Sequence, residues 1–161
     1  MSGVSVDVYD LMCFEMVNSI VGNNWDNVVH MKDTETVKKI ESFGHSIGYR
    51  WAEIKKIKSP AWNSLDEVIR DICSEFWADV FGVESASLHT DNTSIFVISS
   101  PSLRPLLKIR PQEHREDRMR YYALFYKGMI DGIISLAGFH VSTSFRKNRN
   151  SGEYEFIIST L

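Results

Sequence analysis

The chain has 161 residues, of which 43% are apolar, 12% aromatic and 24% charged. This length and composition predict a single globular domain over residues 1–161 and exclude a disordered or collagen-like chain. The formal net charge of −3 gives no overall attraction for nucleic acid, so no nucleic-acid partner is expected.

Compartment is indicated by cysteine content and by targeting patterns. Cys13 and Cys73 are too few for a disulfide framework and favour a reducing environment. The first residues show no signal-peptide pattern, and no apolar run approaches the roughly 20 residues that span a bilayer. We therefore expect a cytoplasmic protein.

Three helices are predicted in the first half of the chain. The first covers residues 8–21 and is apolar on nearly all sides, which indicates burial on more than one side. The second covers residues 34–57, with apolar residues alternately three and four apart, a spacing typical of a seam packed against another helix. The third begins at a capping box formed by Ser64 and Glu67 and ends at Gly82.

The second half of the chain changes to a period of two. Residues 87–98 read as a hairpin, and residues 106–109 as a further strand. A fourth helix is predicted over residues 117–137 and a last hairpin over residues 139–160. Three helices, then strands, one helix and two strands indicate an α+β fold.

No catalytic, metal-binding or cofactor-binding residue is predicted. The five histidines are scattered, and the chain has no His-Glu-x-x-His, Cys-x-x-Cys, nucleophile-elbow or phosphate-loop motif. Glu75 and Asp79 lie four residues apart, which favours a solvated helix face over a paired-carboxylate site. Cys73 lies in an apolar stretch, which is typical of a small core residue rather than a nucleophile.

Two glycine pairs stand out, Gly44-x-x-x-Gly48 and Gly128-x-x-x-Gly132, each inside a predicted helix. A helix-interior glycine costs about 1 kcal/mol relative to alanine, so four of them need a reason. Glycines four apart share a helix face and allow another backbone to come close. Three explanations remain open: packing within the chain, a helix–helix interface with a partner, or a narrow ligand channel.

Several short segments occur in a characteristic order along the chain. They are Phe43–Gly48, Ile69–Phe81, Leu88–Thr90, Ile95–Val97, Gly128–Gly132, Leu136–Phe139 and Glu155–Ile158. Their order and spacing resemble the small subunits of the TRAPP (transport protein particle) vesicle-tethering complex, within the Bet-three-like superfamily and closest to subunit six. The resemblance covers residues 8–160.

This resemblance implies an α/β plait with about four helices packed on one face of a twisted antiparallel sheet. It also implies a non-catalytic scaffold subunit that forms a heterodimer with a Bet-three-like subunit and contacts other TRAPP subunits. The assembled complex would act as a Rab guanine-nucleotide-exchange factor in ER-to-Golgi transport, at ER–Golgi and Golgi membranes. The expected partner interface comprises Leu11, Phe14, Val17, Ile20, Val37, Ile40, Gly44, Ile47 and Trp51.

The resemblance also bears on lipid attachment. The acylated paralogue carries a cysteine at the position that Ser59 occupies in this chain, so no acylation is expected there.

Two alternatives to the scaffold role remain. One is a small-molecule or lipid-binding sensor module of the same fold, with the glycine-lined helices enclosing an apolar channel. The other is peripheral membrane contact through basic residues, each worth about 1 kcal/mol near an anionic surface. These are Lys55, Lys56, Lys58, Arg146, Lys147 and Arg149.

Overall fold

The structure, a computed structural model, describes residues 6–22, 34–58, 62–82, 86–91, 93–100 and 115–161. Its elements, in chain order, are α1 (Val6–Val21), α2 (Thr34–Lys58), α3 (Leu65–Asp71), the π-helical turn η1 (Ile72–Phe76), α4 (Trp77–Phe81), β1 (Ser87–Thr90), β2 (Ile95–Ser100), α6 (Arg115–Leu136), β3 (Val141–Lys147) and β4 (Tyr154–Thr160). The predicted strand at residues 106–109 lies outside the described residues.

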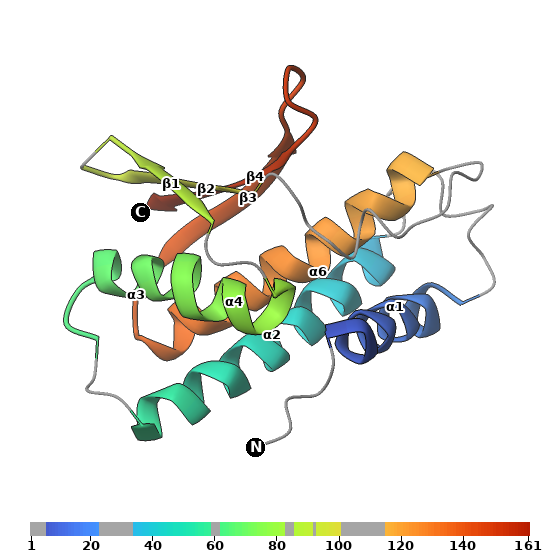
Figure 1. Cartoon of the computed structure of the whole chain (residues 1–161), viewed down its shortest axis with the longest axis horizontal. Coiled ribbons are helices and arrows are strands. Elements are labelled where there is room, and N and C mark those ends of the chain that lie inside the picture. Colours follow the sequence, from blue (N-terminus) through green and yellow to red (C-terminus); the bar gives the residue numbers. More distant parts are fainter. Residues whose placement is uncertain (1–5, 23–33, 59–61, 83–85, 92, 101–114) are drawn as a thin grey trace.

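The four strands form one antiparallel sheet in the order β1-β2-β4-β3. The helices lie on one side of this sheet (Figure 1). The buried residues Tyr154, Phe156 and Ile158 alternate along β4 and therefore share one face. Phe156 is registered against Ile98 of β2, which is also fully buried. This architecture confirms the predicted α+β plait.

Aromatic rings link the helices to the sheet. Trp77 is fully buried, with its ring centroid 4.8 Å from Phe81 and 6.0 Å from Phe156. Phe81 lies 4.8 Å from the ring of Tyr126 on α6, with the two rings edge to face. Such pairs contribute about 0.5–1.5 kcal/mol beyond their area burial. The cluster therefore anchors α4 and α6 to the central strand β4.

The predicted third helix occurs as three consecutive pieces, α3, η1 and α4. Ser64 caps its start as expected, since its side chain accepts a hydrogen bond from the Glu67 amide at 3.3 Å. The Glu67 carboxylate accepts from the amide of Asn63 at 2.7 Å instead of completing the box on Ser64. Gly82 ends the helix in the left-handed region, with φ of 62°. The π-helical turn was not predicted.

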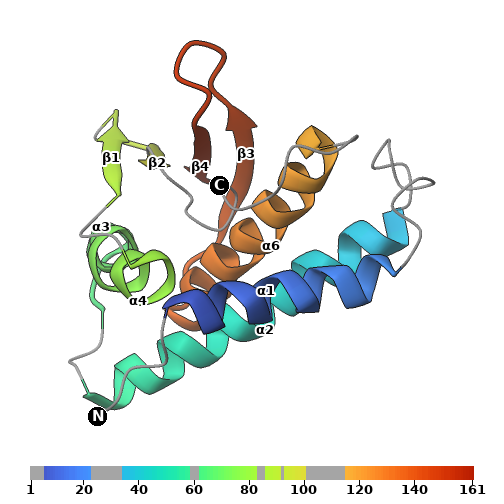
Figure 2. The ribbon, with the colours of Figure 1, turned by 45° about the vertical axis from the view of Figure 1, so that its right-hand side comes forward.

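Helices α2 and α6 lie side by side along most of their length, with α1 packed beside them (Figure 2). The glycines of α2 face the backbone of α6, and the glycines of α6 face that of α2. A Cβ on Gly48 would overlap the carbonyl oxygen of Met129, and one on Gly132 would overlap that of His45. Both glycine pairs therefore serve packing within the chain.

Candidate protein-interaction surface

Helix α1 has a buried side and an apolar exposed side. Cys13, Val17 and Val21 lie four residues apart and are buried against the rest of the chain. On the other side Leu11 is 59% exposed and Met12 is 49% exposed. Large apolar side chains that are left in water on neighbouring helices are typical of an interaction surface.

Helix α2 presents further exposed apolar side chains. Phe43, Tyr49 and Ile54 are all exposed, and Ile54 is 56% exposed. Phe43 and Ile20 of α1 line a groove of about 450 Å³ between the two helices. Ile54 lines a second groove, of about 560 Å³, together with Leu136 at the end of α6. We name the exposed side chains Leu11, Met12, Phe43 and Ile54 the α1–α2 surface. Tyr49 instead stacks on His45, on the side of α2 that faces α6.

The residues predicted to face a partner divide into three groups. Val17 and Ile40 are fully buried, and Gly44 is buried against the backbone of Phe125, so these three serve the chain's own core. Leu11 is well exposed. The others are partly buried and pack against the core, namely Phe14, Ile20, Val37, Ile47 and Trp51. The interface itself stays a prediction, but its exposed part differs from the predicted set.

Sequence reasoning missed the exposure of Met12, Phe43, Tyr49 and Ile54. The prediction followed the apolar seam of each helix, and the seam is the part that a helix buries first within its own chain. The available signal was the presence of large apolar residues outside that seam. Phe43 and Tyr49 show this signal, whereas Ile54 belongs to the predicted apolar stripe of the second helix and is nevertheless 56% exposed.

The structure contradicts the apolar channel that the ligand-binding alternative placed along the glycine-lined helices. The space that Gly44 and Gly48 leave open on α2 is filled by the backbone of α6 at Phe125 and Met129. Because those backbone atoms stand where a Cβ would be, no apolar channel runs along these glycines.

The pair Glu75 and Asp79 is not simply a solvated face, as the sequence had suggested. Lys55 of α2 lies 2.7 Å from the Glu75 carboxylate and 3.4 Å from that of Asp79. The indole of Trp51 also donates a hydrogen bond to Asp79, at 3.0 Å. The hydrogen bond to Glu75 is the main cause that raises the pKa of Lys55. These side chains tie α2 to η1 and α4.

Three of the basic residues proposed for membrane contact are already in ion pairs. Besides Lys55, Arg146 lies 2.6 Å from Glu155, and Lys147 lies 2.6 Å from Glu116. Pairing within the chain reduces the charge that these residues offer to an anionic surface.

Neither described cysteine is placed for catalysis. Cys13 and Cys73 are both buried, and burial raises the pKa of the Cys73 thiol to about 12. Within the described ranges, no group of three or more His, Cys, Asp and Glu side chains is arranged to hold a metal ion. In that same part of the chain, no helix combines the length and apolarity needed to cross a membrane.

The chain is thus an α/β plait with its helices on one face of the sheet, and two neighbouring helices expose large apolar side chains. The chain belongs to the family of transport protein particle (TRAPP) components, whose family model matches residues 9–160. This confirms the resemblance drawn from the ordered segments.

Curated relatives agree with this assignment. Over 102 residues the chain is 24% identical to trafficking protein particle complex subunit 6b of Danio rerio. Over the same length it is 26% identical to subunit 6B of Mus musculus and 24% identical to that of Homo sapiens. Each match covers 63% of this chain and 65% of the relative's own length.

A solved structure shows the same fold. It is subunit 3 of a trafficking protein particle complex from Naegleria fowleri, solved covalently bound to palmitic acid. The TM-score is 0.71 at 14% identity, and the match covers 94% of this chain and 93% of the other. In this chain Ser59, the residue expected to replace the acylated cysteine, lies outside the described residues.

Proposed function

We propose that the chain is a non-catalytic adaptor subunit of a TRAPP-like vesicle-tethering complex, and that it pairs through the α1–α2 surface with a Bet-three-like subunit. The observation that carries this proposal is the exposure of large apolar side chains on two adjacent helices. Their burial in an interface stabilises a complex by about 25 cal/mol per Å² of apolar area.

In this proposal nucleotide exchange on a Rab-type GTPase belongs to the assembled complex. The subunit reaches ER–Golgi and Golgi membranes from the cytoplasm as part of that complex. Family membership supports this placement, and the ion pairing of Lys55, Arg146 and Lys147 favours recruitment through partners over direct membrane contact.

The test is co-expression with a Bet-three-like subunit, followed by size-exclusion chromatography with light scattering. We expect a one-to-one heterodimer. Leu11→Glu and Ile54→Glu place a charge on the α1–α2 surface, and both side chains are more than half exposed, so the fold should tolerate the changes. Each should weaken pairing at least about tenfold, because a charge would be buried without a partner.

The matched control is Ile95→Glu. Ile95 is also an exposed apolar residue, at 41%, but it lies on β2 of the sheet. Its substitution should leave pairing unchanged. If all three variants pair equally well, or if the unmodified chain stays monomeric beside its partner, the proposal is wrong. Variants at Ile40 are less informative, since a charge at this fully buried residue would unfold the chain itself.

A further inference from the structure

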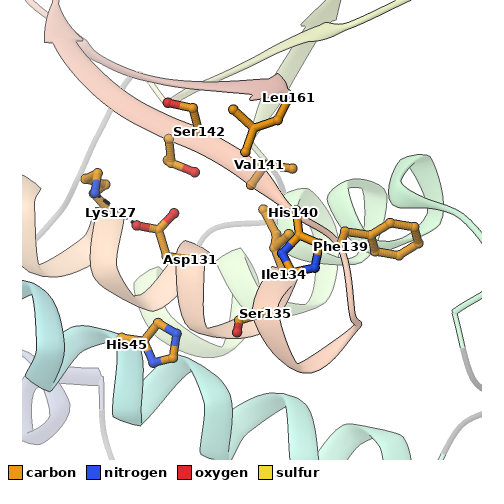
Figure 3. Close-up of a pocket in the computed structure, with 11 residues that line it drawn as sticks. His45, Lys127, Asp131, Ile134, Ser135, Phe139, His140, Val141, Ser142 and Leu161 are labelled. Carbon is orange, nitrogen blue, oxygen red and sulfur yellow. Dashed lines mark hydrogen bonds and ion pairs between the residues drawn. The ribbon is translucent and has the colours of Figure 1, made fainter.

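Two hollows follow β3 on the side where α6 passes it. The first, of about 420 Å³, has Lys127 and Asp131 of α6 on one wall and residues 141–143 of β3 on another (Figure 3). The second, of about 360 Å³, lies between Arg120 of α6 and residues 145–147 of β3. Both hollows are lined by α6 and β3, and the second follows the first along the strand. We therefore treat them as one feature, the β3–α6 groove.

Strand β3 is an edge of the sheet. Among the described residues, β4 is its only paired neighbour. The amide of Thr160 donates to Ser94, on the β2 side of β4, and the amide of Asn148 donates to Glu153 at the start of the β3–β4 pairing. In an antiparallel pair, the backbone groups of successive residues point alternately toward the partner strand and away from it. Counting from these two hydrogen bonds, the backbone groups of Ser142, Ser144 and Arg146 bond to β4.

The residues between them turn their backbone groups the other way. The N–H and C=O of Val141, Thr143 and Phe145 therefore point outward from the sheet edge. A row of such groups is a template on which another strand can pair. The Oγ1 atom of Thr143 is also buried without a hydrogen-bond partner, and Thr143 lines the first hollow.

The two ends of the groove carry opposite charge. At the first hollow the Lys127 ammonium lies 3.0 Å from Asp131, which also lines the hollow, and 2.8 Å from Glu41 of α2, so one cation is paired with two carboxylates. Figure 3 shows the Asp131 side chain directed toward the strand. The second hollow holds three cations and one carboxylate on its walls, namely Arg120, Arg146, Lys147 and Glu116, and Glu155 pairs with Arg146.

We propose that the β3–α6 groove binds an extended segment of a partner protein, which adds a strand to β3. The segment carries a basic side chain at Asp131 and an acidic side chain at Arg120 and Lys147. The first hollow is level with Thr143 and the second with Lys147, four residues along the strand, or roughly 13 Å. An even spacing keeps both side chains on the same face of the added strand. This site is separate from the α1–α2 surface.

The probes are two libraries of nine-residue peptides, randomised over Thr, Val, Ile and Ser. One has Lys and Glu fixed four positions apart, in both orders, and the other has Ala at both positions. The whole chain is used at pH 8. We expect the Lys/Glu library to bind at least tenfold tighter. Bound peptide should slow amide exchange at Val141, Thr143 and Phe145 but not at Ser144.

Two variants separate backbone pairing from side-chain effects. Thr143→Pro removes an outward N–H at an edge position where proline is tolerated. It should lower affinity at least tenfold. Thr143→Val retains the N–H, and its affinity for the peptide should be closer to that of the unmodified chain than the affinity of Thr143→Pro is. Circular dichroism and thermal melting confirm that both variants are folded.

The charge assignment has its own test. Arg120→Glu should weaken binding of the selected Lys/Glu peptide, and replacing the peptide's Glu by Lys should restore binding to this variant. Equal binding of both libraries, undiminished binding to Thr143→Pro, or exchange protection confined to α1 and α2 would each overturn the proposal.

Discussion

Gly48 of α2 lies against Met129 of α6 so closely that a Cβ on the glycine would overlap the methionine's carbonyl oxygen. This contact brings two helix backbones together with no side chain between them. The close packing offsets the cost of about 1 kcal/mol that glycine has relative to alanine inside a helix.

Substituting Gly48 by alanine should therefore destabilise the chain, although alanine favours helix. Backbone cannot move aside as a flexible side chain can, so the overlap should outweigh the gain in helix propensity. We expect a net loss of about 2 kcal/mol or more in the free energy of unfolding, measured by urea denaturation. Ser46→Ala, on the exposed face of the same helix, is the control and should change stability little. An unchanged midpoint for Gly48→Ala would contradict the close packing of α2 and α6.

Lys127 joins α6 to α2 through Glu41 and to its own helix through Asp131. Replacing it by methionine leaves two carboxylates facing each other in a partly buried position. We expect a loss of about 2 kcal/mol, below the 3–5 kcal/mol of a fully buried pair, because the carboxylates keep some exposure. Adding Asp131→Asn to Lys127→Met should recover part of this loss. A double variant less stable than the single one would argue against charge repulsion.

The same ion pairs predict a specific pH dependence. Burial opposes the charge of Lys127, but hydrogen bonds to Glu41 and Asp131 outweigh it and raise the pKa of Lys127 above its usual 10.5. A raised pKa contributes stability that is complete below the unfolded-state value and is lost as the pH rises through the folded-state value. The stability difference between the unmodified chain and Lys127→Met should then decrease only above about pH 10.5.

Asp91 should contribute to the pH dependence of stability under acidic conditions. Its carboxylate accepts hydrogen bonds from the amides of Ile95, Ser94 and Thr93, which hold the pKa of Asp91 well below its usual 3.8. A lowered pKa contributes stability that is present above 3.8 and is lost as the pH falls toward the folded-state value. Asp91→Asn should melt at a lower temperature than the unmodified chain at pH 7, and the gap should close progressively below pH 3.8.

The control for this prediction is Glu35→Gln, which removes an equal charge from an exposed position on α2. Its melting temperature should show no comparable change of gap with pH. If the difference in melting temperature between Asp91→Asn and the unmodified chain is the same at pH 7 and at about pH 2.5, the charge of Asp91 does not stabilise the fold through these amides.

Cys73 should resist alkylation in the native chain. With its pKa raised from 9.0 to about 12, it carries about a thousandfold less thiolate near neutral pH than an ordinary cysteine. We expect iodoacetamide to modify Cys73 at least about a hundredfold more slowly in the native chain than in urea, as followed by peptide mass spectrometry. Similar rates in both states would show that the helix opens readily around this residue.

Much of the fold could be predicted from local pattern. The start of the third helix follows from Ser64 and its end from Gly82, because a cap needs only its own side chain and the neighbouring amides. The π-helical turn at residues 72–76 was not predictable in this way. One extra residue in a turn hardly changes an apolar stripe, so periodicity does not report it.

The candidate interaction surface was predicted less well. The sequence correctly indicated helices with more apolar residues than one face can bury, but Val17 and Ile40 proved to be core residues, whereas Met12 and Ile54 are exposed. The apolar character of a residue does not show whether it is covered by its own chain, covered by a partner or left exposed. That depends on how helices separated in sequence are placed against each other.

By itself, the sequence determined most of the helices and strands, the unusual glycine pairs inside two helices, and the family. Only the tertiary structure decided that α2 and α6 satisfy those glycines in each other, that Lys55 joins Glu75 and Asp79, and that β3 is left at a sheet edge beside a charged groove. The physical reason is that caps and periodicity act within a few residues, whereas burial, ion pairing and edge exposure arise between segments distant in the chain.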